Sequence, residues 1–408
     1  MQKKRILVVT QHFWPENFRI NDIVEGFLAD GLEVDVLCGL PNYPKGEWFP
    51  GYSGKGPWRE NYKGANVYRC REISRKGNTG LRIFANYCSW PLFARLSLHR
   101  LPGGYDAILC YNTSPVLMNW PALAAGKKFK APVSSYVLDI WPENLYSVLP
   151  VKNKLLRGIA QAVSDWNYRR ADRLIAMSSG LRERLLQRTG KQPECVAVIP
   201  QYCEDHYAVP QREAALAAQY EPYFNLAFAG NFSPAQSLDT VLCALKLANE
   251  RRQAGQKPLH LLLVGDGMSR PALEKLAGEL CLEKSVTFYG SVPPEKIPAI
   301  NGFADALLVS LSDSPDLGLT VPAKVASCMA AGKPLLASMN GEGARAVAES
   351  GGGLVSPACH AEALAENMLA LAAMSEDERM AMGKKSKAYY EAYYCREKLL
   401  RQIETFIL

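Results

Sequence analysis

The segment of residues 309–343, VSLSDSPDLGLTVPAKVASCMAAGKPLLASMNGEG, constrains the fold more than any other. An apolar run ends in a loop of Gly, Ser, Asp and Pro. A helical pattern rich in small residues then stops at Gly332, and a second apolar run occupies Pro334–Ser338. Strand, loop, helix and strand are the parts of a doubly wound α/β domain, where ligands bind at the carboxyl ends of parallel strands. The loop 313–321 leads into a helix N-terminus with Lys324 in its first turn, which suits an anion such as pyrophosphate.

The same alternation of strand-like and helical patterns continues along the whole chain. Helical patterns such as Ile20–Ala29 and Leu181–Arg188 separate apolar runs, which predicts parallel sheets covered by helices on both faces. The first series of strand-like runs lies at Arg5–Thr10, Val34–Cys38, Ala107–Tyr111, Val133–Leu138, Leu174–Met177 and Val196–Pro200. A second series begins at Asn225, after a joining segment near Pro200–Glu213.

A chain of 408 residues is too long for one ordinary core, so two domains are expected. We predict an α/β fold of two Rossmann-like, doubly wound domains that face a cleft. The N-terminal domain is predicted over residues 1–203 and the C-terminal domain over 204–385. A C-terminal helical segment, 386–408, is predicted to pack back on the first domain.

Cysteine use and hydropathy predict a cytoplasmic protein. The eleven cysteines are scattered and include no CxxC pair, which favours reduced thiols over disulfides or zinc. The first apolar run, RILVVT, is not preceded by a signal peptide. The longest nearly apolar stretch, Pro115–Gly126, has 12 residues and is too short to cross a bilayer.

Positive charge is concentrated in the first half of the chain. Residues 1–200 contain 28 Lys and Arg against 16 Asp and Glu, and residues 51–100 contain ten against two. No nucleic-acid-binding module accompanies this charge, which excludes nucleic acid as the expected partner. Residues 80–101 interleave large apolar side chains with Arg and His. Such a helix lies either in a membrane interface or against the core, and the local charge favours contact with anionic lipid.

The first strand is followed by QHFWPENFRIN rather than by a glycine-rich loop. This counts against a dinucleotide cofactor, because such glycines let the backbone approach a pyrophosphate. Glu16, Asn17 and Arg19 follow this strand and are predicted either to enter the cleft and bind an acceptor or simply to begin a helix. The histidines show no metal-ligand spacing, so no metal site is expected.

Several short motifs together form a specific combination, although each alone is weak. They are VVTQHFWPENFRIND (8–22), LCGLPNYPKGEWFPGY (37–52), YVLDIWPEN (136–144), FAGNFSPAQSL (228–238), LLLVGDG (261–267), VTFYGSVP (286–293) and the 309–343 segment. Over its whole length the chain therefore resembles the retaining glycosyltransferases of family 4, which have the two-domain GT-B fold. Within that family it resembles the subgroup that builds bacterial O-antigen and capsule and often transfers N-acetylated deoxyaminosugars such as L-fucosamine.

This resemblance implies a UDP-sugar donor held by the C-terminal domain and an acceptor held by the N-terminal domain. Transfer would retain the anomeric configuration and need neither metal nor cofactor. The implied acceptor is a polyprenyl-diphosphate-linked saccharide at the inner face of the cell membrane, with which the protein would associate peripherally. Asn42 and Tyr43, in the PNYP segment, are predicted to join Glu16, Asn17 and Arg19 at the acceptor.

The resemblance also assigns donor-binding positions. The predicted donor residues are Asn231, Gln236, Gly265, Tyr289, Gly318, Leu319, Thr320, Lys324, Ser327 and Glu342. Asn231 and Gln236 would face the pyrophosphate or sugar, Gly318 to Thr320 would offer N–H groups to phosphate, and Tyr289 begins a loop that reads the base. The family usually has two glutamates where this chain has Leu319 and Ser327, and a basic pair where it has Asn231 and Gln236. Lys324 and backbone N–H groups would then carry more of the phosphate binding.

Asp139 is the predicted catalytic residue, with Glu143 as the second choice. Asp139 follows the apolar run VSSYVL at a carboxyl end where a site is expected, although an Asp before a helix also serves as an N-cap. Two other functions remain open for a chain of this architecture. One is a nucleotide-sugar epimerase or hydrolase, and the other is a non-catalytic nucleotide-sugar-binding protein.

Overall fold

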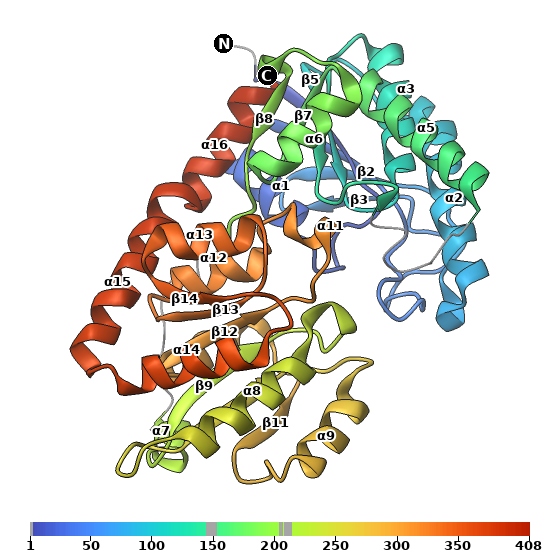
Figure 1. The fold of residues 1–408 in the computed structure, drawn as a ribbon. Coiled ribbons are helices and arrows are strands. Elements are labelled where there is room, and N and C mark those ends of the chain that lie inside the picture. Colours follow the sequence, from blue (N-terminus) through green and yellow to red (C-terminus); the bar gives the residue numbers. More distant parts are fainter. Residues whose placement is uncertain (1–2, 144–152, 204–206, 208–213) are drawn as a thin grey trace. The chain divides into compact units, whose positions relative to one another are not determined.

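The computed structural model describes residues 3–143, 153–203, 207 and 214–408 (Figure 1). These residues divide into two compact units. The first comprises the described residues up to Ile199 together with Leu400–Leu408, and the second comprises those from Pro200 to Leu399.

The first unit contains an eight-stranded sheet within its described residues, in the order β3-β4-β2-β1-β5-β6-β7-β8. The strands are β1 (Arg5–Val9), β2 (Glu33–Cys38), β3 (Arg59–Tyr62), β4 (Ala65–Arg69), β5 (Ala107–Asn112), β6 (Val133–Val137), β7 (Arg173–Ala176) and β8 (Val196–Val198). Neighbouring strands are parallel except β3 and β4, which are antiparallel. The central strands are buried along their whole length, as expected of a sheet covered on both faces.

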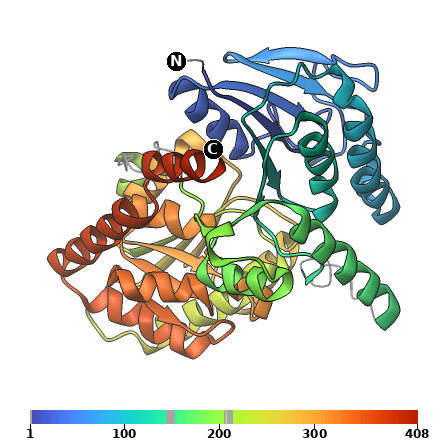
Figure 2. The same ribbon diagram turned by 90° about the horizontal axis from the view of Figure 1, so that it is seen from above.

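Helices cover both faces of this sheet (Figures 1 and 2). They are α1 (Ile20–Ala29), α2 (Gly80–Leu96), α3 (Asn119–Phe129), α5 (Lys154–Arg170) and α6 (Ser179–Thr189). Helices α2 and α3 contribute Trp90 and Ala122 to a core with Leu7 and Val9 of β1. On the other side, α1 is close-packed against the C-terminal segment, since a Cβ at Gly26 would lie 2.7 Å from Leu400 Cδ1.

The second unit contains a six-stranded, all-parallel sheet within its described residues, in the order β11-β10-β9-β12-β13-β14. Its strands are β9 (Phe224–Ala229), β10 (Leu259–Val264), β11 (Val286–Gly290), β12 (Ala306–Ser310), β13 (Leu335–Ser338) and β14 (Gly353–Ser356). Its helices are α7 (Ala214–Gln219), α8 (Leu238–Arg251), α9 (Arg270–Glu279), α10 (Ile297–Phe303), α11 (Pro315–Gly318), α12 (Ala323–Ala330), α13 (Glu342–Ser350), α14 (Ala361–Ala373) and α15 (Glu376–Tyr393).

Successive residues of one strand separate the two cores of this unit. Leu261 and Leu263 of β10 pack with α8 and α14, whereas Leu262 between them packs with α12 and α15. This alternation follows from the two-residue period of a strand. The predicted fold class, two doubly wound α/β units, is therefore confirmed.

Three local features differ from the sequence-based expectation. The antiparallel hairpin of β3 and β4 was not predicted, because both strands are short and β3 is polar and largely exposed. The loop 313–321 contains a short helix, α11. The C-terminal segment does not change units at residue 386, because α15 runs on to Tyr393 and packs closely on the second unit. The last helix, α16 (Arg396–Ile407), joins the first unit from Leu400 onward.

Each sheet has a point where the strand order changes direction. In the first unit β1 lies between β2 and β5, and in the second unit β9 lies between β10 and β12. Open α/β sheets bind ligands outside the carboxyl ends of the strands at such points. The segments after β1 and β9 are therefore where a site is expected.

Candidate functional site: an anion pocket and a polar network

A cavity of about 410 Å³ lies in the second unit at the expected point. Its walls come from the segments after β9, β10 and β11 and from the first turns of α12. They include Asn231, Gly265, Asp266, Ser291, Val292, Lys324 and Ser327. Of the predicted donor residues, Asn231, Gly265, Lys324 and Ser327 thus line one cavity.

Lys324 supplies the positive charge of this cavity. Its Nζ lies 3.5 Å from the centroid of the Phe228 ring and donates to Gln236 Oε1 over 3.3 Å. Burial lowers the pKa of Lys324 to about 8, because removal from water disfavours the charged form. The half-buried ammonium group contacts a ring face and an amide oxygen within the described chain, and such a cation is suited to receive an anion.

Two glycines make room for this arrangement. A Cβ at Gly230 would lie 2.6 Å from Lys324 Nζ, so a larger residue would displace the ammonium group. Gly265 has a φ of +132°, and a Cβ there would lie 1.9 Å from the Gly230 carbonyl oxygen. The close approach of the two segments after β9 and β10 therefore requires glycine at Gly265, and Gly230 leaves the space that the Lys324 side chain occupies. Gly265 had only weak support as a sequence motif, and the structure gives it a steric reason.

The other predicted donor residues do not line this cavity. Gln236 reaches it only through Lys324. Tyr289 is exposed on β11, although Ser291 and Val292 of the same loop do line the cavity. Of the predicted residues that do line the cavity, Ser327 uses its hydroxyl within α12, where it donates to the Ala323 carbonyl oxygen over 3.1 Å.

The segment around α11 and α13 forms a separate group of predicted residues. The Gly318 N–H donates to the Ser314 carbonyl oxygen over 3.1 Å, so it is used within the short helix. Leu319 and Thr320 follow it and are half-buried. Glu342 lies in the first turn of α13, where its Oε2 accepts from Arg345 Nη2 over 2.6 Å. None of these residues is among those that line the cavity.

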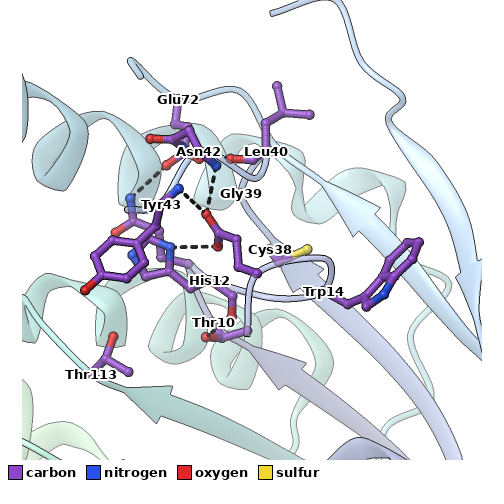
Figure 3. Close-up of polar contacts among 12 residues, drawn as sticks. Thr10, His12, Trp14, Cys38, Gly39, Leu40, Asn42, Tyr43, Glu72 and Thr113 are labelled. Atoms are coloured by element: carbon purple, nitrogen blue, oxygen red, sulfur yellow. Dashed lines mark hydrogen bonds and ion pairs between the residues drawn. The ribbon is translucent and has the colours of Figure 1, made fainter. Parts of the chain in front are cut away.

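The first unit presents a different kind of site after β1 (Figure 3). The carboxylate of Glu16 is buried, and its Oε2 lies 2.8 Å from His12 Nδ1. Its Oε1 accepts from the backbone N–H groups of Asn42, over 2.8 Å, and Tyr43, over 2.6 Å. One carboxylate thus joins the segment after β1 to the segment after β2, and it orients the His12 ring.

A second buried carboxylate, Glu72, stabilises this arrangement through three hydrogen bonds. It accepts from Gln11 Nε2 over 2.7 Å, from Asn42 Nδ2 over 2.8 Å and from Asn86 Nδ2 over 3.0 Å. Burial raises the pKa of Glu72 to about 8, and the nearby Glu16 charge adds to this, whereas the amide donors and Arg75 oppose it. Sequence reasoning missed Glu72, because Gln11 and Glu72 are 61 residues apart and follow strands that only the fold brings together.

The network presents aromatic and polar groups at its surface. The His12 ring stacks on Phe18 with centroids 4.8 Å apart, and the partly exposed Tyr43 ring lies 5.2 Å from His12. Thr113, in the segment after β5, lies on the same side of the network as Tyr43 and His12 (Figure 3). Aromatic faces beside hydrogen-bonding groups are the usual components of a carbohydrate-sized polar site.

The five predicted acceptor residues have different environments. Glu16 and Asn42 are buried and bind other parts of the chain, so they position the site rather than offer free polar groups to a ligand. Tyr43 and Asn17 are exposed, and Arg19 is half-buried immediately before α1. Direct contact with an acceptor thus remains a prediction for Tyr43, Asn17 and Arg19.

The two predicted catalytic carboxylates are also distinguished by their surroundings. Asp139 is half-buried two residues after the end of β6, on the carboxyl side of the sheet. Glu143 accepts from Arg188 Nη1 over 3.0 Å and lies 3.4 Å from Arg184 Nη2. Arg188 also binds Asp165 over 2.7 Å, so Glu143 belongs to an ion-pair network on α5 and α6. The segment that follows Glu143, residues 144–152, lies outside the described residues.

Two further expectations concern metals and membranes. Among the residues that the structure describes, no group of three or more His, Cys, Asp and Glu side chains is placed to hold a metal ion. Within the same part of the chain, no helix combines the length and the apolar character that crossing a bilayer requires.

Family models match both units. The model described as "Glycosyl transferase 4-like domain" matches residues 17–201, and the model described as "Glycosyl transferases group 1" matches residues 223–374. The two ranges do not overlap and together cover most of the chain. With two parallel-sheet units of this kind, the chain belongs to the glycosyltransferase family with the GT-B fold.

Individual relatives and solved structures are also described as glycosyltransferases. The chain is 27% identical over 240 residues to "Probable glycosyltransferase WbjE" of Pseudomonas aeruginosa, a match that covers 56% of each chain. It spans about half the length of the curated relatives it matches. Among solved structures it is similar to Anabaena HepE in complex with UDP, with a TM-score of 0.69 and 16% identity over 98% of both chains. It is also similar to WaaG, "a glycosyltransferase involved in lipopolysaccharide biosynthesis", with a TM-score of 0.68 and 16% identity over 99% of both chains.

Proposed function

We propose that this protein transfers a sugar from a UDP-sugar to a lipid-linked saccharide during the synthesis of a bacterial surface polysaccharide. The observation that carries the proposal is the cavity at the point where the second sheet changes direction, with the half-buried Lys324 side chain on its wall. A cation in such a cavity at the carboxyl ends of parallel strands is suited to a pyrophosphate. The similar HepE structure holds UDP, which supports the choice of nucleotide.

The reaction in this proposal follows the retaining course implied by the family resemblance. The bond between the sugar C1 and the β-phosphate oxygen breaks, and a bond forms between C1 and the acceptor oxygen on the same face. The acceptor proton passes to the departing phosphate. Lys324 stabilises the negative charge that develops on that phosphate, and Asp139 stabilises the positive charge on the sugar.

The proposal includes no metal ion and no cofactor. Lys324 and the N-terminus of α12 supply the positive potential that a divalent cation would otherwise supply. Activity that survives a chelator would support this part of the proposal, and activity restored only by Mg²⁺ or Mn²⁺ would overturn it.

The acceptor half of the proposal uses the polar network after β1. Tyr43, Asn17 and Arg19 contact the hydroxyl groups of a saccharide acceptor. Glu16 and Asn42 hold the segments after β1 and β2 in place. We further propose that the acceptor is a polyprenyl-diphosphate-linked saccharide at the inner face of the cell membrane. The relatives WbjE and WaaG support a place in O-antigen or lipopolysaccharide synthesis, and the sequence resemblance favours an N-acetylated deoxyaminosugar.

One assay separates this function from its alternatives. The protein is incubated with a panel of UDP-sugars and a bacterial membrane lipid extract, and the nucleotide and lipid products are followed by mass spectrometry. Sugar transferred to lipid is the expected result. Conversion of the donor without lipid product would instead identify an epimerase or hydrolase, and binding without turnover would identify a non-catalytic protein. The anomeric configuration of the product, measured by NMR, tests retention.

A further inference from the structure

The helices α2, α3 and α5 of the first unit carry an unusual share of the exposed apolar residues. Of the seventeen large hydrophobic side chains exposed among the described residues, nine lie on these three helices. They are Leu81, Phe84, Leu92 and Leu96 on α2, Trp120 on α3, and Leu155, Leu156, Ile159 and Trp166 on α5. Scattered exposed hydrophobics are ordinary, but a gathering of this kind marks a contact surface.

Helical spacing places these side chains in stripes. Leu81, Phe84, Leu92 and Leu96 share one face of α2, whereas Trp90 and Ala94 face the core. Leu155, Ile159 and Trp166 similarly share one face of α5. The sequence left open whether the 80–101 segment faces the core or a membrane. In the structure, α2 has apolar residues on the face that packs on the core and also on the exposed face.

The three helices meet at a second cavity. Its volume is about 740 Å³, and its lining includes Arg95 of α2, Trp120 and Lys127 of α3, and Trp166 and Arg170 of α5. The helices gather on one side of the first unit (Figures 1 and 2). We name this region, with its exposed apolar stripes, the α2–α3–α5 surface.

The charge of this surface is strongly positive. Helices α2, α3 and α5 contain eight Lys and Arg residues and one acidic residue, Asp165, which is paired with Arg188. Within the described chain, no carboxylate forms an ion pair with Arg95, Lys127 or Arg170. The one acidic residue in the cavity lining, Asp172, has its Oδ2 bound to the Val133 N–H over 2.8 Å.

A tryptophan and an arginine side chain lie next to each other at this cavity, as is typical of a surface that contacts lipid headgroups. The Arg170 guanidinium lies 4.9 Å from the centroid of the Trp166 ring, and both side chains are exposed. Tryptophan prefers the headgroup level of a bilayer, where its ring is half in the apolar layer and its N–H is in water. Basic pockets between helices bind anionic lipid headgroups.

We propose that the α2–α3–α5 surface docks on a bilayer that contains anionic phospholipid, with a headgroup phosphate in the cavity between Arg95, Lys127 and Arg170. The apolar stripes of α2 and α5 enter the acyl boundary on either side, and Trp120 and Trp166 lie at the headgroup level. Positive charge favours this occupant over a second copy of the chain, because two copies of this surface repel each other. This inference names the membrane contact of the proposed function, although no sugar substrate is needed to test it.

The charge arm of the test uses sedimentation with vesicles of phosphatidylcholine, alone or mixed with phosphatidylglycerol. The full chain is expected to bind the mixed vesicles far more tightly than the neutral ones. The triple variant Arg95→Gln, Lys127→Gln and Arg170→Gln should weaken binding to the mixed vesicles by roughly a hundredfold, at about a fivefold loss for each basic residue near the surface. A matched variant with Lys275→Gln, Lys284→Gln and Lys384→Gln, exposed in the second unit, should bind as wild type does.

The apolar arm uses tryptophan fluorescence with lipids brominated on their acyl chains. Quenching is expected in the wild type and should fall in Trp120→Phe and in Trp166→Phe. The variant Leu81→Ser with Ile159→Ser should bind mixed vesicles at least tenfold more weakly, because these exposed side chains then lose their apolar burial. Unchanged circular dichroism and UDP affinity show that each variant is folded.

Three results would overturn the proposal. They are equal binding to neutral and anionic vesicles, equal loss in the surface variant and its matched control, and a stable dimer that the surface variants dissociate. Vesicle binding without sugar transfer would leave this inference standing and reject the proposed function. Transfer to lipid without vesicle binding would do the reverse.

Discussion

The segments that follow β1 and β9 occupy equivalent positions in the two sheets, yet they contain different kinds of residue. After β9 the chain has Gly230 and faces Gly265, so backbone and a half-buried cation, Lys324, form part of the wall of a cavity. After β1 the chain has bulky and polar side chains, and the Glu16 carboxylate ties them to the next segment. In the proposed function, the same topology therefore serves an anion in one unit and hydroxyl-bearing ligands in the other.

This comparison assigns separate tasks to the two units. The second unit should determine donor affinity and stabilise the leaving phosphate, and the first unit should determine acceptor affinity and supply the Asp139 carboxylate to the chemical step. Substitutions in one unit should leave the task of the other unchanged.

Asp139→Asn should have the largest effect. A carboxylate that stabilises transition-state charge contributes on the order of 10²–10⁴ in rate, so turnover should fall by that factor while UDP affinity stays the same. Initial rates and calorimetric UDP titrations measure the two quantities. Asn caps helices about as well as Asp, so a capping role predicts wild-type turnover instead.

Glu143→Gln is the matched control for that substitution. Glu143 binds Arg188, which also binds Asp165, so its loss should lower the midpoint of thermal unfolding more than the rate. If Glu143→Gln abolished turnover and Asp139→Asn did not, the order of the two candidates would be reversed.

Lys324→Ala should have the next largest effect, on donor affinity. Loss of one charged hydrogen bond to phosphate costs about 1.5–3 kcal/mol, which corresponds to a roughly ten- to hundredfold rise in the dissociation constant for UDP. Lys275→Ala removes an exposed lysine from the same unit and should leave UDP affinity unchanged. Equal UDP affinity in wild type and Lys324→Ala would show that Lys324 does not bind the UDP phosphates.

Glu16→Gln should have a smaller effect, on the acceptor. The carboxamide still accepts from Asn42 and Tyr43 but no longer provides the negative charge beside His12, so the acceptor KM should rise about two- to tenfold. Glu47→Gln makes the same charge change at an exposed position of the segment after β2 and should leave KM unaltered. A rise in UDP dissociation constant with no change in acceptor KM would contradict the division of tasks.

The smallest expected effect is proton uptake when UDP binds. Burial lowers the pKa of Lys324 to about 8, so part of the free protein is neutral there near pH 8, and bound phosphate raises that pKa again. Calorimetry in buffers of different ionisation enthalpy should detect a fraction of a proton taken up near pH 8, falling toward zero near pH 6. UDP affinity should decline as pH rises above 8. Lys324→Ala should abolish both trends.

The sequence predicted the architecture well, because the central strands are buried and mostly apolar and helices such as α1 have an amphipathic pattern. The predicted helix Ile20–Ala29 coincides with α1, and the predicted stop at Gly332 follows α12. The β3–β4 hairpin was not predicted, because β3 is a short, polar strand in which only the last residue is buried. The position of a short, two-sided polar strand depends on pairing that local pattern does not encode.

Residues of the candidate site were predictable where a local motif contains them, but the contacts between distant segments were not. Lys324 and its helix lie in a single motif, so its place beside the cavity followed from the sequence. The contacts of Glu72 with Gln11 and Asn42 join residues 61 and 30 positions apart, and only the folded sheet brings these segments together. Likewise, the need for glycine at Gly230 depends on the Lys324 side chain, which arrives from a distant helix.

The most direct test of the division between the two units is a titration of UDP into four forms of the full chain. These are the wild type, Lys324→Ala, Glu16→Gln and the double variant, measured by calorimetry under one set of conditions. We predict that Lys324→Ala weakens UDP binding roughly ten- to hundredfold, that Glu16→Gln binds UDP as wild type does, and that the double variant matches Lys324→Ala. Weakened UDP binding in Glu16→Gln together with wild-type binding in Lys324→Ala would contradict the assignment of the donor to the second unit.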